Sequence, residues 1–488
     1  MATLAAYHCS PRAQNEKKHD YNSDVAAIFH FDHIAAFVSD HAEEILRTIP
    51  TLPGVFALRG PREMDEPYLT RTSDLRRRMR RLLDPPESQS KRLNLRDKVA
   101  RIEYCITGSE FESSLVLYDA AAALFGPAQA RRRLKLHTPC FLRLALENAY
   151  PRVYATNRLS KRALDNTYGP FPSRAAAERY CDAVLDLFKL RRCHEDLSPY
   201  PEHPGCAYGE MKKCLEPCKQ ACSPEQYATE ASAVKAFFDT RGESMLSQIS
   251  AERELASAEM EFEKAAASHV QWQKVKAAAS LADEIVRPVS ALNAVIVQEA
   301  AVPEGEHPEQ AGIFLLKGGC LAGPERLSTL GVRAVKEQTS VGSSLFPQPL
   351  MLQAVPLEGE AVTPTESPEE RANAVLEKLE ERIGGISDLA LLSDHLSLFR
   401  RWYYRPEKQR AGEIFLPNAD GVWPVRRILR GAARMVLGEP TPLPEVQREA
   451  AKEAKVRILH EGRPDVERVV PVVDKRAKKR KENAVPRS

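Results

Sequence analysis

The residues with the most evident chemistry are clustered cysteines. The chain holds ten cysteines, and five of them lie between Cys193 and Cys222. Their spacing is Cys193-x12-Cys206-x7-Cys214-x3-Cys218, and Cys222 follows after three more residues. Clustered thiols in a reducing compartment indicate metal ligands before disulfides.

The spacing favours an iron–sulfur cluster over zinc. Paired C-x2-C knuckles, which are typical of structural zinc sites, are absent from this segment. Irregular loop spacing that ends in C-x3-C fits four thiolates around an iron–sulfur cluster. Zinc remains the alternative, and a set of free, partly buried thiols is the interpretation without a metal.

Two strongly basic blocks flank one small predicted unit. Residues 71–101 hold eleven Lys/Arg and four Asp/Glu, and residues 129–162 hold nine Lys/Arg and one acid. Such patches bind phosphate backbones by charge and counterion release, although a solvated helix face is the commoner role of a charge run. The predicted DNA-binding residues are Arg71, Arg76, Arg77, Arg80, Arg131, Arg132, Arg133 and Lys135.

Length and composition describe an ordinary globular chain of several units. The 488 residues allow about three or four domains. The 70 Lys/Arg and 67 Asp/Glu give a net charge of only +3, which excludes a uniformly basic nucleic-acid binder. No apolar run is long enough to span a membrane, and the N-terminus lacks a secretory signal. We therefore predict a cytoplasmic protein that does not bind membranes.

The elements around the first basic block are two strands and a helix. Residues 1–48 are a weakly patterned extension with a helix near 35–46. Strands are predicted at 52–58 and 68–70. A helix is predicted to begin near Asp74, to bury Leu75, Met79, Leu82 and Leu83 on one face, and to end before Pro85.

Helices and then strands follow the cysteines. Residues 223–287 are predicted to be helical, with a break at 240–243 that gives a helical pair. Strands are predicted at 292–297, 313–316 and 414–416, with a hairpin turn at 317–320. A loop at 356–368 precedes a helix over 369–383. The last fifty residues are polar, helical or disordered, and the basic run 474–481 is a nucleic-acid tail or a solubilising tail.

The order of several motifs over residues 50–440 resembles the UvrC family, the C subunit of the bacterial UvrABC excinuclease. Pro53-Gly54-Val55-Phe56, then Tyr68-Leu69-Thr70 and the Arg-rich helix, resemble a GIY-YIG nuclease unit. Gly169-Pro170-Phe171-Pro172-Ser173 and Cys206-x7-Cys214-Leu215-Glu216-Pro217-Cys218 resemble the segments that follow in the family. Residues 260–266 are similar to the UVR motif that docks on the UvrB helicase.

The resemblance implies an α/β multidomain fold with a small GIY-YIG-like α/β domain. The implied domains are an N-terminal extension (1–48), a degenerate GIY-YIG-like domain (49–128), a basic α/β linker domain (129–190), a Cys-cluster segment (191–224), a helical hairpin with a UVR-like motif (225–288), a partial RNase H-like α/β region (289–440) and a polar basic tail (441–488).

The nuclease positions implied by the resemblance are only partly retained. The family's second tyrosine falls on Tyr68 and its arginine on Arg78, whereas its first tyrosine falls on Phe56. Its metal-binding glutamate falls on Leu117 or Tyr118, and neither is the oxygen ligand that Mg²⁺ requires. The neighbouring carboxylates Glu112 and Asp119 point elsewhere on a helix. The family's RNase H-like Asp, Asp and His, and its helix-hairpin-helix modules, have no recognisable counterpart here.

The predicted function is therefore a UvrC-like DNA-binding protein of nucleotide excision repair without its own nuclease activity. One alternative is an active excinuclease-type endonuclease with a relocated ligand for Mg²⁺ or Mn²⁺. The other is an iron–sulfur scaffold or redox-sensing protein. The implied partners are DNA and a UvrB-type helicase, the latter through Glu261, Phe262, Glu263 and Ala266. The implied cofactor is a four-iron four-sulfur cluster on Cys193, Cys206, Cys214 and Cys218.

Overall fold

The computed structural model describes residues 29–62, 64–85, 93–194, 197–302, 309–332, 366–383, 388–406 and 409–439, and the backbone of 455–460 and 463–471. The chain divides into two compact units. The first comprises residues 1–289 with 387–405, and the second comprises 290–386 with 406–488. The predictions for residues 1–28, for 356–365 and for the basic run 474–481 lie outside the described residues.

The first unit begins with an antiparallel sheet in the order β1-β4-β2-β3. Its elements are β1 (His33–Ala36), α1 (Ala42–Thr48), β2 (Gly54–Arg59), β3 (Tyr68–Thr72), α2 (Leu75–Leu83), β4 (Arg101–Ile106), α3 (Glu110–Phe125) and α4 (Pro127–Arg133). Strand β1 pairs with β4, so the sheet includes part of the segment that the sequence assigned to an N-terminal extension. Strands β2 and β3 and helix α2 lie where the sequence predicted them.

The two faces of this sheet bury different helices. Helix α2 begins at the Asp74 cap, whose side chain accepts a hydrogen bond from the Arg77 amide at 2.8 Å. Its four apolar residues are buried as predicted, in one core with Phe56 of β2. The next residue of β2, Ala57, packs instead with Ala120 of α3. Because side chains alternate along a strand, α2 and α3 cover opposite faces.

A second antiparallel sheet, in the order β6-β5-β7-β8, forms the middle of the same unit. It consists of β5 (Cys140–Leu144), β6 (Val153–Thr156), β7 (Thr167–Phe171) and β8 (Arg287–Pro288), and α5 (Arg174–Leu185) packs on it. At Gly169 of β7 a Cβ atom would lie 2.6 Å from the Phe141 ring, so the close approach of β5 and β7 requires glycine there.

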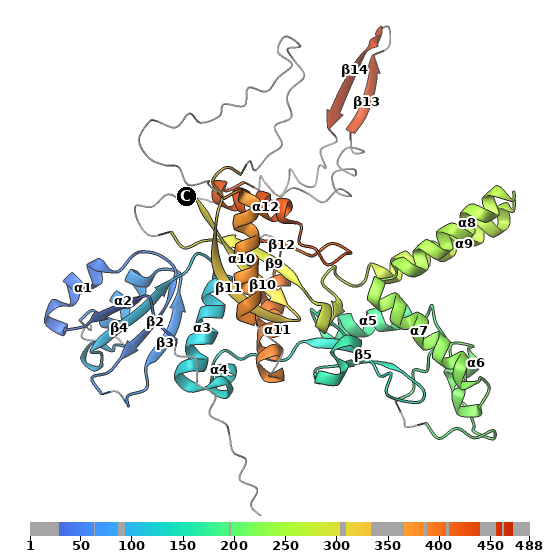
Figure 1. Ribbon diagram of the computed structural model, residues 1–488, viewed down its shortest axis with the longest axis horizontal. Coiled ribbons are helices and arrows are strands. Elements are labelled where there is room, and N and C mark those ends of the chain that lie inside the picture. The colour runs from blue at the N-terminus through green and yellow to red at the C-terminus, as the bar shows by residue number, and fades with distance from the viewer. Residues whose placement is uncertain are drawn as a thin grey trace, which may run out of the picture. The chain divides into compact units, whose positions relative to one another are not determined.

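The cysteine segment and three helices follow. Helix α6 (Ala207–Glu210) is a single turn, and α7 (Pro224–Thr240) begins with a capping box at Ser223. The predicted break at 240–243 is confirmed. A second break at 259–261 divides the rest into α8 (Glu243–Ala258) and α9 (Phe262–Ala279), which lie side by side as a hairpin (Figure 1).

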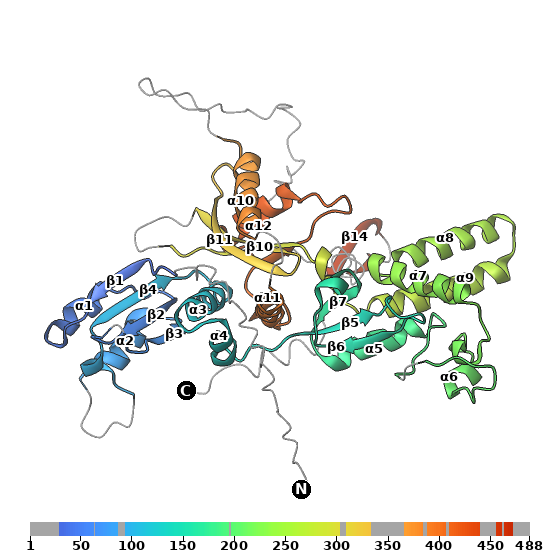
Figure 2. The same cartoon turned by 60° about the horizontal axis from the view of Figure 1, so that its bottom comes forward.

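The last helix of the first unit comes from far along the chain. Helix α11 (Leu389–Tyr403) contacts α3 of the first sheet region and β7 of the second, and lies between them (Figure 2). No pattern in the sequence had predicted this helix. Its residues are buried nearly all round, from Leu392 to Phe399. It therefore joins the two halves of the unit.

The second unit is built on an antiparallel sheet in the order β11-β10-β9-β12. Its elements are β9 (Ala294–Glu299), β10 (Gln310–Lys317), β11 (Cys320–Ser328), α10 (Pro368–Ile383), β12 (Glu413–Phe415) and α12 (Val425–Leu437). The predicted strands, the turn at 317–320 and the helix over 369–383 are confirmed. Near the C-terminus, β13 (Lys455–His460) pairs with β14 (Arg463–Pro471), where the sequence had predicted helical or disordered chain.

None of the helices in the described ranges is long and apolar enough to cross a lipid bilayer.

Candidate functional site

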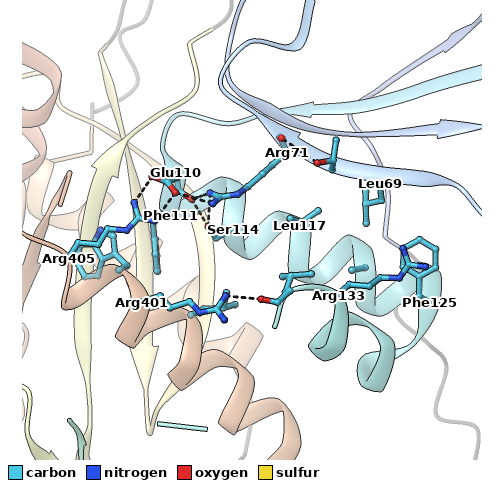
Figure 3. Close-up of a pocket in the computed structure, with 15 residues that line it drawn as sticks. Leu69, Arg71, Glu110, Phe111, Ser114, Leu117, Phe125, Arg133, Arg401 and Arg405 are labelled. Atoms are coloured by element: carbon cyan, nitrogen blue, oxygen red, sulfur yellow. Dashed lines mark hydrogen bonds and ion pairs between the residues drawn. The ribbon is translucent and has the colours of Figure 1, made fainter. Parts of the chain in front are cut away.

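An arginine-lined pocket lies among β3, α3, α4 and α11 in the first unit. Its volume is about 310 Å³. Arg71 reaches it from β3, Arg133 from α4, and Arg401 and Arg405 from α11 and the residues just after it (Figure 3). The one carboxylate that lines it is Glu110, so the charged lining carries four positive groups and one negative group.

Glu110 holds two of the four guanidinium groups. Arg71 donates to the Glu110 carboxylate at 3.0 Å and to the Ser114 hydroxyl at 3.1 Å. Arg405 donates to both carboxylate oxygens, one of them at 2.6 Å. These bonds and charges, with Arg405 contributing most, lower the pKa of Glu110 to about 2. The two arginines are thus placed to grip one oxyanion between them.

The other two guanidinium groups have different partners. Arg401 donates to the carbonyl oxygens of Leu134, at 2.8 Å, and of Lys135. Burial and the nearby charges of Arg400 and Arg71 lower its pKa. Arg133 pairs with Glu66 and lies 3.9 Å over the Phe125 ring. Positive charge in the pocket therefore exceeds what Glu110 balances.

Leu117, one of the two positions predicted to match the family's metal-binding glutamate, faces this pocket. Glu110, Ser114, Leu117 and Ala121 all line it, and their spacing places them along one face of α3. Asp119 does not line it. If Leu117 is the matching position, the pocket face of α3 carries an isobutyl side chain in place of a metal ligand.

Tyr118, the next residue, enters a buried polar network. Its hydroxyl donates to Asp394 of α11 at 3.0 Å. Arg131 of α4 donates to both oxygens of the same carboxylate, at 2.7 and 3.2 Å. His395 lies edge-on to the Tyr118 ring, and burial lowers its pKa to about 4. The network ties three helices together, and His395 packs against it.

The retained nuclease residues lie apart from this pocket. The Arg78 guanidinium donates to the Tyr68 hydroxyl at 3.1 Å, so these two residues are brought together. Phe56 is buried, with its ring centroid 6.3 Å from that of Tyr68. Neither Tyr68 nor Arg78 lines the pocket that contains Leu117. The structure therefore does not assemble Tyr68, Arg78 and Leu117 in one pocket.

The residues predicted to bind DNA are placed in three ways. Arg71 and Arg133 line the pocket, and Arg131 is held by Asp394. On α2, Arg76 donates to the Ile49 carbonyl at 2.5 Å and Arg80 is half-buried. Exposed side chains are those of Arg77, Arg132, Arg133 and Lys135.

The four predicted cluster ligands are half-buried neighbours. Burial, and then the negative charges of Cys206, Cys193 and Cys218, raise the pKa of Cys214 to about 11, against a hydrogen bond from the Glu216 amide. Arg191 donates to the Cys193 sulfur at 3.7 Å. Even so, among the residues described here no three His, Cys, Asp or Glu side chains lie close enough to hold a metal ion. The donor chemistry fits a thiolate-bound cluster, and the cluster stays a prediction.

Residues 260–266, which the sequence predicted to be a UVR-like motif, lie at the tip of the α8–α9 hairpin. Met260 is 76% exposed and Phe262 is 69% exposed. Glu261, Glu263 and Ala266 are exposed as well. All four residues predicted to contact a partner are therefore accessible at one end of the hairpin.

Several residues of the pocket region were not predicted from the sequence. They are Glu110, Asp394, Arg401, Trp402 and Arg405. For Arg401, Trp402 and Arg405 a local signal exists in the run Arg400-Arg401-Trp402-Tyr403-Tyr404-Arg405, in which cations flank aromatic residues. Such a mixture is typical of nucleic-acid contacts as well as of packed helix ends.

The two-sheet first unit, its cysteine segment and its helical hairpin define an α/β multidomain protein. Residues 140–237, from β5 through most of α7, match the family model of the UvrC/Cho excinuclease middle domain. This middle segment of the chain therefore resembles the corresponding domain of the UvrC family.

Curated relatives named UvrABC system protein C agree with this assignment. The protein of Alcanivorax borkumensis is 27% identical over 210 residues, which are 43% of this chain and 34% of the relative. The values are 27% over 224 residues (46% and 36%) for Carboxydothermus hydrogenoformans and 29% over 233 residues (46% and 34%) for Acidobacterium capsulatum. The chain thus spans about a third of the length of these relatives. No solved structure shows a significant match.

Proposed function

We propose that the protein is a DNA-binding factor of nucleotide excision repair that does not cut DNA itself. The observation that carries the repair role is the match of residues 140–237 to the UvrC/Cho middle domain. Exposed arginines on α2 and α4, together with the arginine-lined pocket, support DNA binding through phosphate contacts.

The loss of nuclease activity is supported by the chemistry of the pocket. A GIY-YIG nuclease needs a carboxylate that holds a divalent metal, because the metal acts as a Lewis acid on the phosphate. Leu117 offers no oxygen ligand, and Phe56 lacks the hydroxyl of the family's first tyrosine. Tyr68 and Arg78 remain hydrogen-bonded to each other, but the two residues alone do not make up the catalytic residues that such a nuclease needs.

One observation favours the alternative of an active nuclease with a relocated ligand. Glu110 lies on the same face of α3 as Leu117, two turns earlier, and lines the same pocket. Its two oxygens are already engaged by Arg405 and Arg71. The four arginines that line the pocket disfavour a divalent cation there, which favours the non-cutting function.

An incision assay separates the two functions. The full chain, purified without oxygen, would be incubated with lesion-bearing duplex, UvrA, UvrB, ATP and Mg²⁺ or Mn²⁺. We expect salt-sensitive duplex binding and no incision. Incision that is abolished in Arg78→Ala or Glu110→Gln, but retained in the exposed α1 variant Arg47→Ala, would overturn the proposal.

We propose in addition that the hairpin tip docks on a UvrB-type helicase. Exposed Met260 and Phe262 on a narrow tip, bordered by Glu261 and Glu263, support an apolar contact with a charged rim. Phe262→Ala is expected to weaken co-elution with UvrB at least tenfold, because a buried aromatic anchor contributes about 2 kcal/mol or more. Val270→Ala, half-exposed on the same hairpin, is the control. Equal co-elution of wild type and Phe262→Ala would refute this docking site.

We further propose a four-iron four-sulfur cluster on Cys193, Cys206, Cys214 and Cys218. Such a cluster would hold the loop between α5 and α7 and could exchange electrons when bound. Anaerobic protein is expected to contain iron and acid-labile sulfide, both lost in Cys214→Ser and retained in Cys222→Ser. Zinc in place of iron would establish the alternative metal, and the absence of both metals would refute the site.

A further inference from the structure

We infer that the arginine-lined pocket binds the phosphate group of a nucleotide, with Glu110 occupying the oxyanion position when no ligand is bound. The choice of a nucleotide as the phosphate carrier rests on the proposed DNA-binding function. The anion site itself rests on the pocket.

Two arginines already surround the Glu110 carboxylate in the pocket. Its carboxylate accepts hydrogen bonds from Arg71 on one side and Arg405 on the other, so the two guanidinium groups already clamp an oxyanion (Figure 3). Guanidinium forks bind phosphate oxygens with the same donor pattern as carboxylate oxygens. A phosphate carries more acceptor oxygens than Glu110 offers and could displace a side chain that is half-exposed.

Unbalanced positive charge lies beside this pair of arginines. Arg401 lies in the same pocket and donates to two backbone carbonyl oxygens. Burial, and after it the positive charges of Arg400 and Arg71, lower the pKa of Arg401. A dianion in the pocket would relieve that repulsion, which gives the site a preference for phosphate over a neutral ligand.

The volume and the apolar lining of the pocket suit a ligand larger than phosphate alone. A volume of about 310 Å³ is larger than a bare phosphate needs and lies at the lower end of small-molecule sites. Apolar side chains of Leu69, Leu117 and Leu398, with the rings of Phe125 and Trp402, supply the remaining wall. This combination suits a sugar or base next to a phosphate.

The test measures binding of deoxyadenosine 5′-monophosphate to the full chain by calorimetry, with deoxyadenosine and inorganic phosphate for comparison. We expect binding of the monophosphate and none of the nucleoside. Arg401→Ala should weaken binding about ten- to a hundredfold, as for a lost hydrogen bond to a charged group. Arg47→Ala, exposed on α1, should bind as wild type does.

The Glu110→Gln variant provides a second test of phosphate binding if the Arg401→Ala variant fails to fold. Because this change removes the competing carboxylate, it should tighten binding of the monophosphate. A purely structural role for Glu110 predicts no such gain. Unchanged or weaker binding in Glu110→Gln, or equal binding of nucleoside and nucleotide, would overturn the inference.

A further binding experiment distinguishes phosphates within a nucleic-acid strand from a free or terminal phosphate. A short single-stranded oligonucleotide without terminal phosphates would be compared with the mononucleotide. Dependence of both on Arg401 indicates that the site accepts phosphates within a strand, and dependence of the mononucleotide alone indicates a free or terminal phosphate. Duplex binding without mononucleotide binding leaves the proposed function standing and rejects this site. Mononucleotide binding without duplex binding rejects the proposed DNA-binding function and leaves the phosphate site standing.

Discussion

At the residue scale, burial decides what each titratable side chain can do. His395 is 7% exposed and contacts the edge of the Tyr118 ring, with Asp394 next to it on α11 and Arg131 on the other side of that carboxylate. Burial lowers the pKa of His395 to about 4. The imidazole is therefore neutral in the folded protein at neutral pH, and its protonation opposes folding.

The pH dependence of stability follows from this lowered pKa. The unfolded chain gains a proton on His395 below its ordinary pKa of about 6.5, whereas the folded protein resists until about pH 4. The free energy of unfolding should therefore fall as the pH is lowered through this window, by up to about 3 kcal/mol. Urea unfolding at several pH values would measure the slope. His395→Gln should flatten it, and the exposed His137→Gln should not; an unaltered slope in His395→Gln contradicts the prediction.

At the scale of elements, α11 completes contacts that the N-terminal helices cannot satisfy alone. Asp394 accepts hydrogen bonds from Tyr118 of α3 and from Arg131 of α4. Just after the same helix, Tyr404 donates to the carbonyl of Pro170 in β7 at 2.9 Å. One helix thus fixes the pocket and the middle sheet together.

Asp394→Ala should destabilise the first unit, on the order of 3 kcal/mol, because it leaves Tyr118 and Arg131 without their shared acceptor. Chemical denaturation of the full chain would measure the loss, with exposed Asp97→Ala as the control. In a double-mutant cycle, Tyr118→Phe and Asp394→Ala should be strongly non-additive. Additive losses would show that the hydrogen bond between them carries little energy.

At the scale of the whole molecule, a nearly neutral chain concentrates its positive charge. The net charge is +3, yet both basic blocks belong to the first unit, where several of their arginines are exposed. Arginines that are paired with acidic residues inside the protein contribute less to the positive potential at its surface. Arg131 is committed to Asp394, whereas Arg77 is exposed on α2.

The salt dependence of DNA binding should distinguish these two arginines. Each phosphate contact adds about 0.9 to the slope of log K against log salt concentration. Arg77→Ala is therefore expected to lower the slope by about one unit. Arg131→Ala should reduce stability and leave the slope unchanged. Fluorescence anisotropy with a labelled duplex would test both, and a lower slope for Arg131→Ala would place it in the interface instead.

Local patterns predicted the elements, and long-range contacts determined the pocket. The Asp74 cap and the apolar spacing up to Leu83 predicted α2, because both signals act within a few residues. The turn at Gly318-Gly319 likewise predicted the β10–β11 hairpin. The pairing of Glu110 with Arg405 joins residues 295 positions apart, and nothing local encodes such a contact.

The missed helix illustrates the same limit. The polar residues of helix α11, among them Ser393, Asp394 and Ser397, are buried in the fold, so their spacing did not mark a solvent-facing side of a helix. In the same way, the pairing of β1 with β4 depends on a partner some seventy residues later and not on the pattern of β1 itself. Both elements are defined by what packs against them.

The distance between α3 and α11 along the chain has a consequence for synthesis on the ribosome. Tyr118 meets Asp394 only after 276 further residues have been translated. At about 5–20 residues per second, that interval is roughly 15 to 55 seconds. During it, the face of α3 that α11 later covers is exposed on a nascent chain. The first unit, although it begins at the N-terminus, therefore finishes folding late, and chaperones would meet it with its arginine pocket half built.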